Sequence, residues 1–294
     1  MRKIIVDKKF NNKKIQNILQ FNFNGLSSSL FFKTLRKKDI KVNGKRITDN
    51  IIVFEDDIIE IYLDDKYLFK TFSLDILYED DNILVINKPQ GIEVLSDEET
   101  CLTNLIRQKY RFENNFPYPC HRLDRNTSGL VLYAKNKESL DILNLKIKEH
   151  EILKFYKCTV IGILSNKEAT LKDYLFKDSK KSIVYINKTF KPGYKEIITS
   201  YKVLGEDIKN NLSTLEVNLK TGRTHQIRAH LAYIGHPILG DGKYGNNEIN
   251  KKFNKSKQEL CAYKIIFKFK TDASILNYLN NKEFKIKGPI DKMS

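Results

Sequence analysis

From about residue 76 onward, the chain is a succession of short apolar stretches with few helices between them. Residues 83–86 and 130–134 are continuous apolar runs, whereas residues 155–160 and 215–219 alternate between apolar and polar side chains. A doubly wound parallel fold would show strands and helices in regular alternation. The pattern therefore predicts an α+β domain built on a large mixed, mainly antiparallel sheet.

Two stretches of this region have the spacing of helices. Residues 138–149 carry apolar side chains on one stripe. Further on, Thr224 can cap a helix that runs through Ile227 and Leu231 and ends at Gly235. The segments 163–200 and 244–259 show no readable sequence pattern, and we expect them to be surface loops that help to select the molecule the protein binds.

The first 64 residues have the pattern of a separate small α/β module. Ile15 begins a helical spacing, and the serines at 27–29 can cap a second helix. Asn43-Gly44 is a tight-turn signal, and residues 57–62 form a closing strand. We therefore predict a module at 1–64, a polar linker at 65–75 and a second domain at 76–294.

The charge balance favours a polyanionic partner. The chain has 52 Lys and Arg against 36 Asp and Glu, a formal net charge of +16, and basic side chains release counterions from phosphates. No apolar run is long enough for a signal peptide or a membrane span. The four cysteines form no CxxC pair, which is typical of a reducing compartment. We expect a cytoplasmic protein that binds nucleic acid, with no membrane association.

The segment 121–130, HRLDRNTSGL, places one carboxylate among basic and hydroxyl side chains. Arg122 and Arg125 flank Asp124 closely, and opposite charge and hydrogen bonds both favour an ionised carboxylate. Such a group can act as a nucleophile or a base, or it can belong to a structural salt-bridge network. From these residues alone, the structural salt-bridge network is the favoured interpretation, because an Arg-Asp-Arg arrangement near a turn usually forms one.

The segment 219–231, LKTGRTHQIRAHL, adds a positive group at the start of a helix. A helix N-terminus beside Arg223 favours an anion. His225, His230 and His236 invite a metal reading, but no HExxH or comparable ligand set is present. We expect no metal site, and we interpret these histidines as hydrogen-bonding or surface groups.

Together with residues 78–91, YEDDNILVINKPQG, these two segments resemble the signature motifs of the RluA-type pseudouridine synthases. Residues 1–64 are similar to the S4 RNA-binding domain, through the basic helix end, KVNGKRI and the strand DDIIEI. An S4-like module in front of the motifs makes the order similar to that of the RluC/RluD-like members.

The resemblance implies a role for each matching residue. Asp124 would be the catalytic aspartate, Arg223 its basic partner, and Tyr156 the ring that stacks on the target base. Arg122 would fill the space of the flipped nucleotide, and Lys88 with Pro89 would be structural. Two apolar residues would line the pocket: Ile227 and Leu231. The S4-like module would face RNA with Lys33, Arg36, Lys37, Lys38, Lys41, Lys45 and Arg46.

The implied activity is isomerisation of uridine to pseudouridine in RNA, most directly in 23S ribosomal RNA, by a monomer that needs no cofactor. The chemistry replaces the N1–C1′ bond by a C5–C1′ bond on a flipped-out nucleotide, with Asp124 as nucleophile or as base. Three alternatives remain: a tRNA target, a catalytically silent RNA-binding or ribosome assembly protein, and a glycoside hydrolase. The hydrolase is disfavoured because its chemistry needs two carboxylates.

Overall fold

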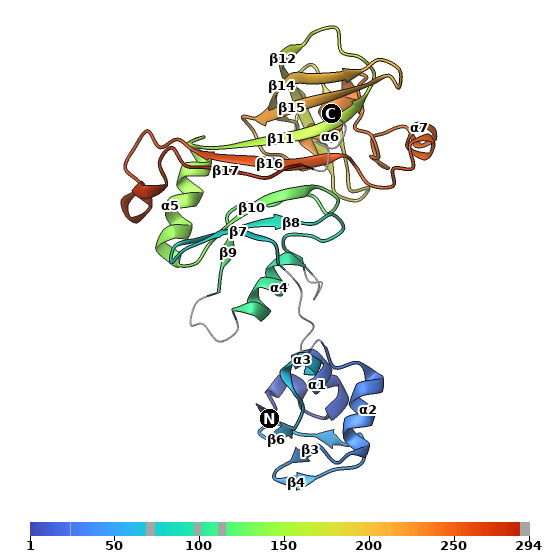
Figure 1. Cartoon of the computed structure of the whole chain (residues 1–294), viewed down its shortest axis with the longest axis vertical. Helices are drawn as coiled ribbons and strands as arrows, with labels where there is room; N and C mark the ends of the chain where they lie inside the picture. Colours follow the sequence, from blue (N-terminus) through green and yellow to red (C-terminus); the bar gives the residue numbers. More distant parts are fainter. Residues whose placement is uncertain (24, 69–73, 97–100, 111–115, 289–294) are drawn as a thin grey trace. The chain divides into compact units, whose positions relative to one another are not determined.

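A computed structural model describes residues 1–23, 25–68, 74–96, 101–110 and 116–288 (Figure 1). The chain divides into two compact units, Met1–Ser73 and Leu74–Ser294. Each unit has its own buried apolar core, so each is described by itself below.

The first unit contains small strands and short helices. Its elements are β1 (Arg2–Ile5), the 3-10 helix η1 (Lys8–Phe10), β2 (Lys13–Lys14), α1 (Ile15–Asn22), α2 (Ser28–Arg36), β3 (Ile40–Val42), β4 (Lys45–Arg46), β5 (Ile52–Val53), β6 (Ile58–Ile61) and α3 (Asp65–Leu68). Four strands form an antiparallel sheet in the order β1-β6-β3-β4, and β2 pairs with β5.

The local signals of this unit act as the sequence predicts. The Ser27 hydroxyl caps α2 by accepting a hydrogen bond from the backbone N–H of Leu30 at 3.2 Å. Asn43 and Gly44 both have positive φ, +49° and +78°, as a two-residue hairpin turn between β3 and β4 requires.

The predicted linker starts too early. Residues 65–68 form α3, and the Leu68 side chain is fully buried in the core of the first unit. A single buried apolar residue in a polar stretch produces no helical periodicity, so the sequence does not predict this helix. Residues 69–73 of the predicted linker lie outside the described part of the chain.

The second unit carries most of the strands. Its elements are β7 (Ile76–Glu79), β8 (Ile83–Lys88), α4 (Leu102–Lys109), β9 (Tyr118–Pro119), β10 (Ser128–Ala134), α5 (Lys137–Lys148), β11 (Ile152–Ile161), β12 (Glu168–Asp178), β13 (Ile183–Asn187), β14 (Lys195–Asp207), β15 (Leu212–Leu219), α6 (Gln226–Tyr233), α7 (Asn247–Lys252), β16 (Leu260–Phe267), the 3-10 helix η2 (Ser274–Leu279) and β17 (Glu283–Lys285).

Eleven of these strands form one sheet, whose main order is β13-β12-β14-β15-β11-β16-β10-β8-β7. β17 adds to β16, and β9 adds to β10. The strand pairs are antiparallel except β10 with β16, which run parallel through the pairs Ser128–Cys261 and Gly129–Ala262. The α+β class with a mainly antiparallel sheet is therefore confirmed.

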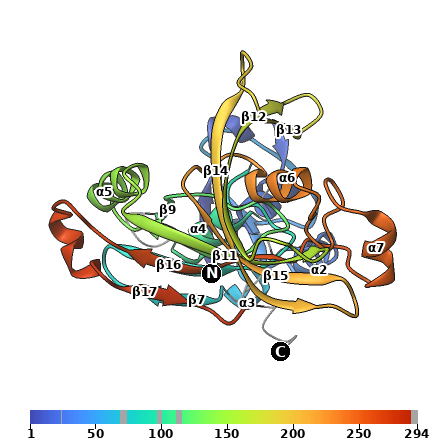
Figure 2. The same ribbon diagram turned by 90° about the horizontal axis from the view of Figure 1, so that it is seen from above.

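Both faces of the central strands are buried. In β8, Leu84 and Ile86 join one apolar core, while Ile83 and Val85 join the core on the opposite face. A strand covered on both sides has no polar alternation, which explains the continuous apolar run in the sequence. Helix α5 contacts β10 and β11 (Figure 1), and α6 packs against β13 and β14 (Figure 2).

The expectation of surface loops at 163–200 and 244–259 is wrong. The first segment forms β12, β13 and the start of β14, and the second contains α7. Most side chains of β12 are exposed or half-buried, so no regular apolar alternation marks it. Of the helices in the described ranges, none combines the length and the apolar character that crossing a membrane requires.

Candidate active site

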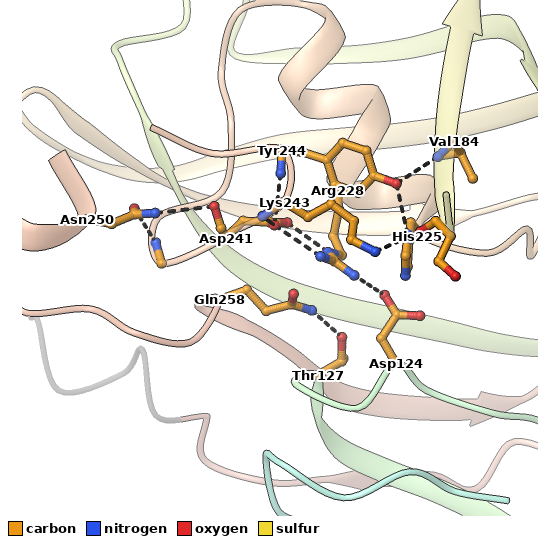
Figure 3. Close-up of polar contacts among 12 residues, drawn as sticks. Asp124, Thr127, Val184, His225, Arg228, Asp241, Lys243, Tyr244, Asn250 and Gln258 are labelled. Carbon is orange, nitrogen blue, oxygen red and sulfur yellow. Dashed lines mark hydrogen bonds and ion pairs between the residues drawn. The ribbon is translucent and has the colours of Figure 1, made fainter. Parts of the chain in front are cut away.

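Asp124 lies in the loop that leads into β10, and the fold fixes this loop from within. The N–H of Thr127 donates to the backbone carbonyl of Asp124 at 3.0 Å, which closes a tight turn. The buried Thr127 hydroxyl accepts a hydrogen bond from Gln258 at 2.7 Å (Figure 3). The carboxylate therefore projects from a held backbone rather than from a free loop.

Lys88 ties the same loop to the end of β8. Its side chain is fully buried, and Nζ donates to the carbonyl oxygens of Pro89 and Ile92, both at 2.9 Å, and of Arg125 at 3.1 Å. Burial lowers the pKa of Lys88 to about 8, although the charge of Asp124 acts in the other direction. The contacts are those of a structural lysine, because its three donors are all used within the fold.

Gly129 allows β10 to approach β16 closely. Its φ is +112°, and a Cβ at this position would lie 2.3 Å from the carbonyl oxygen of Ala262. Only glycine accepts both the conformation and the contact. The parallel pairing of β10 with β16, directly after the Asp124 loop, depends on this residue.

The side chain that contacts Asp124 is Arg228. Its Nη1 lies 3.0 Å from Asp124 Oδ2, while its Nε and Nη2 donate to the two oxygens of Asp241 at 2.7 and 3.0 Å (Figure 3). The Asp241 side chain is completely buried, and a quarter of the Asp124 side chain is exposed. Asp241 therefore orients the guanidinium, which presents its free edge to the more accessible carboxylate.

The charges of this cluster stabilise one another. Burial alone would lower the pKa of Arg228, but the hydrogen bonds and the charge of Asp241 raise it above the usual value. Burial alone would raise the pKa of Asp241, but the hydrogen bond and the charge of Arg228 lower it. Both groups are ionised at neutral pH, so Asp124 faces a permanent positive charge.

The prediction that Arg223 pairs with Asp124 is wrong. Arg223 is exposed and lines the same cavity, but the described contacts of Asp124 are with Arg228. Helix α6 begins at Gln226, with His225 and not Thr224 at the N-cap, and no side chain caps it. Arg228 therefore sits inside the first turn, where the helix turns it toward Asp241.

Tyr244 contacts both His225 and the Arg228 guanidinium. The Tyr244 hydroxyl accepts a hydrogen bond from the N–H of Val184 at 2.9 Å and lies 2.8 Å from Nδ1 of His225 (Figure 3). The Arg228 guanidinium lies 5.2 Å from the centre of the Tyr244 ring. Burial lowers the pKa of His225 to about 4, so this imidazole is neutral at pH 7. The sequence analysis gave no role to Tyr244 or Asp241, because their separation from Arg228 along the chain matches no known motif.

Asp124 opens into a cavity of about 540 Å³. Tyr156, Arg122, Arg223 and Ile227 also line it. Burial, together with the charge of Asp124, raises the pKa of Tyr156, so its phenol is protonated at neutral pH. A smaller cavity of about 240 Å³ shares Asp124 and Arg122 with the first. The sequence thus names four residues that the fold gathers around one carboxylate.

The other predicted site residues lie elsewhere. Leu231 is fully buried in the core and is not one of the residues that line the cavity, which corrects its predicted role. His230 is buried between Thr199 and Asp173, at 2.9 Å from each, and is therefore structural. Within the described residues, no group of three or more His, Cys, Asp or Glu is placed to hold a metal ion.

The predicted RNA-facing residues of the first unit gather at one end of α2 and on the hairpin that follows. Lys33, Arg36, Lys37, Lys38, Lys45 and Arg46 are exposed, and Lys41 is half-buried. Arg46 donates a hydrogen bond to the carbonyl of Lys38 at 2.9 Å, and Lys41 lies over the Tyr62 ring. The hairpin and the helix end thus present positive charge together.

Known proteins resemble this chain over most of its length. An uncharacterized RNA pseudouridine synthase of Mycoplasma capricolum is 34% identical over 98% of both chains. The ribosomal large subunit pseudouridine synthase C of Buchnera aphidicola from Acyrthosiphon pisum is 31% identical, over 94% of this chain and 96% of its own. The solved structure of human RNA pseudouridylate synthase domain containing 4 is 21% identical, covers 73% of this chain and 88% of its own, and has a TM-score of 0.59, which supports the fold.

The family model for RNA pseudouridylate synthase matches residues 82–233, a segment that contains Asp124, Tyr156 and Arg228. With the similarity to the relatives above, this match shows that the chain belongs to the RNA pseudouridine synthase family and isomerises uridine in RNA.

Proposed function

We propose that this enzyme modifies uridines of large-subunit ribosomal RNA and that Asp124 is its catalytic carboxylate. The RNA class follows the names of relatives such as the Buchnera enzyme, which align with nearly the whole chain. The observation that carries the assignment of Asp124 is its place in the cavity wall. It is a partly exposed carboxylate held at 3.0 Å by an arginine that a second, buried carboxylate orients.

The reaction that fits this site is an internal rearrangement. The N1–C1′ bond of uridine breaks, the uracil turns within the cavity, and C5 bonds to C1′ while its proton leaves and N1 gains one. The sugar carbon develops positive character when the bond breaks, and an ionised carboxylate beside it stabilises that charge or adds to it. Asp124 meets this need without a cofactor, since no atom is gained or lost overall.

Tyr156 supports the same reaction from the neighbouring strand. It lies in β11, lines the cavity and keeps its phenol protonated. Its ring provides a surface on which the detached uracil can stack while it turns. Arg122 is exposed and lines both cavities, which suits a side chain that enters the space left by a flipped nucleotide. The exposed basic end of the first unit supplies further contacts to phosphates.

Pseudouridine mapping of total RNA tests the proposal. Cells that lack the gene should lose pseudouridine at defined positions of 23S ribosomal RNA, and the wild-type gene should restore them. Asp124→Asn keeps the shape of the side chain and removes its charge, so the purified variant should bind RNA with an affinity near that of the wild type but form no pseudouridine. Restoration by Asp124→Asn would refute the role of Asp124, and losses confined to tRNA would refute the choice of RNA.

A further inference from the structure

The wall of the large cavity carries more positive than negative side chains. Among the described residues that line it, Asp124 is the single carboxylate, and Arg228 binds both Asp124 and the buried Asp241 behind the wall. The basic residues of the wall are Arg122, Lys148, Lys154, Lys220, Arg223 and Arg228. A cavity with this balance is built to receive negative charge in addition to the uracil base.

Lys154 is the member of this set with the most specific position. It lies on β11 two residues before Tyr156, so both side chains point to the same face of the strand, with their Cα atoms about 7 Å apart. The lysine is half-buried, and burial lowers its pKa. Within the described part of the chain, its ammonium group forms no hydrogen bond or ion pair, and its electrostatic neighbour is the Cys120 thiol.

Two other buried lysines show what a structural role requires in this fold. Lys88 donates to three backbone carbonyls. Lys146 contacts Glu151 and both the carbonyl and the hydroxyl of Thr271. In each case the three donors of the ammonium group are used, which offsets the cost of burial. Lys154 is half-buried without such partners, so its donors are available to a ligand in the cavity.

His121 lies beside Lys154 on the same wall and strengthens this reading. Its Nε2 accepts a hydrogen bond from the N–H of Leu132 at 3.2 Å, so in the neutral ring the proton is on Nδ1. Burial and the charge of Lys154 both lower the pKa of His121, which keeps the ring neutral. Nδ1 is buried and makes no geometric hydrogen bond among the described residues, and the backbone of Arg122 acts on the pKa of the ring in the direction opposite to burial. The neutral imidazole therefore does not neutralise the charge of Lys154.

We infer that Lys154 binds a phosphate of the RNA strand next to the flipped uridine and so fixes the strand relative to Asp124. The inference rests on the proposed function of the cavity. A phosphodiester matches the site because it is anionic, offers only acceptors and follows each nucleoside of the strand. The separation of about 7 Å between Lys154 and Tyr156 suits a base stacked on the ring and the neighbouring phosphate bound to the ammonium group.

The test compares Lys154→Met with Lys157→Met. Lys157 lies on the same strand with the opposite orientation, and its Nζ lies 4.8 Å from the centre of the Tyr263 ring, so its substitution is a matched control. The probe is a fluorescein-labelled single strand of uridylates, and its affinity is measured over a series of salt concentrations. Loss of one phosphate contact should reduce the slope of log K against log salt by about 0.7 in Lys154→Met. Lys157→Met and Lys154→Arg should keep the wild-type slope.

Urea unfolding without RNA separates binding from structure. Lys154→Met removes a cation that has no partner, so it should be at least as stable as the wild type. The inference fails if the slope of Lys154→Met equals that of Lys157→Met, or if Lys154→Met is clearly less stable. It also fails if Lys154→Met stops pseudouridine formation with its binding unchanged. The binding assay needs no turnover, so it gives its answer whether or not Asp124 proves to be catalytic.

Discussion

Removal of the Arg228 guanidinium should show how much the ion pair between Arg228 and Asp241 contributes to the stability of the fold. Arg228→Met deletes both hydrogen bonds to Asp241, whose side chain is completely buried. A buried carboxylate that loses its partner costs about 3–5 kcal/mol. Since domains are stable by only about 5–15 kcal/mol, the variant should fold but unfold at a much lower urea concentration.

A second substitution identifies the source of that loss. Asp241→Asn removes the charge but keeps an oxygen for the N–H groups of Lys243 and Tyr244, which donate to Asp241 at 2.8 and 3.1 Å. The double variant Arg228→Met/Asp241→Asn should therefore recover about 2 kcal/mol or more of the loss. Both Arg228→Met and the double variant should be inactive, because Asp124 lacks its cationic partner in each.

Urea unfolding at pH 7 measures the two stabilities, and pseudouridine formation on ribosomal RNA measures the activity. If the double variant is no more stable than Arg228→Met, the charge of buried Asp241 is not what destabilises the single variant. If Arg228→Met retains full activity, the contact between Arg228 and Asp124 is not part of the mechanism. The two readouts are independent, so each half of the reasoning can fail alone.

Two further substitutions test the backbone and the titration of the site. Gly129→Ala should lower the free energy of unfolding of the second unit by at least about 2 kcal/mol, because a positive φ and a clash with Ala262 act together. Gly235 is the control: its φ is +88° with open space around it, so Gly235→Ala should cost about 1 kcal/mol in the same urea assay. Equal losses would mean that the close approach of β10 to β16 does not contribute to stability. His225 has a folded-state pKa of about 4, below its ordinary value, so the unfolded chain takes up the proton first and stability falls as the pH drops from about 6.5 toward 4. Unfolding of His225→Gln measured between pH 7 and pH 4.5 should show a smaller fall than the wild type, and an identical fall would contradict the assignment.

The sequence predicted the strands that are buried on both faces and the residues of the main motif, because both leave local patterns. Asp124, Tyr156, Arg122 and Ile227 are found around one cavity. The prediction of Arg223 as the partner of Asp124 failed for a physical reason. Which arginine meets Asp124 depends on where α6 begins and on the position of Asp241, thirteen residues further along the chain. Neither is set by spacing within the motif.

The strands β12 and β13 could not be predicted for a different reason. Most of their side chains are exposed or half-buried, and they are held by backbone pairing with one another and with β14. Hydrogen bonds between backbones leave no trace in the order of side chains, whereas burial does. Helix α3 was hidden similarly, since one buried leucine is too little for a period.

The parallel pairing of β10 with β16 is a short junction of the sheet next to the site. Along the main strand order this junction is the shortest, with two residue pairs where β10 and β8 share six. Asp124 belongs to the segment on one side of the junction, and Arg228 and Tyr156 belong to elements on the other. A small parting of the sheet here would separate the carboxylate from its arginine while every strand stayed intact. In the structure the two sides meet, with Asp124 3.0 Å from Arg228, so a nucleotide that contacts Tyr156 and Asp124 together would hold them in this arrangement.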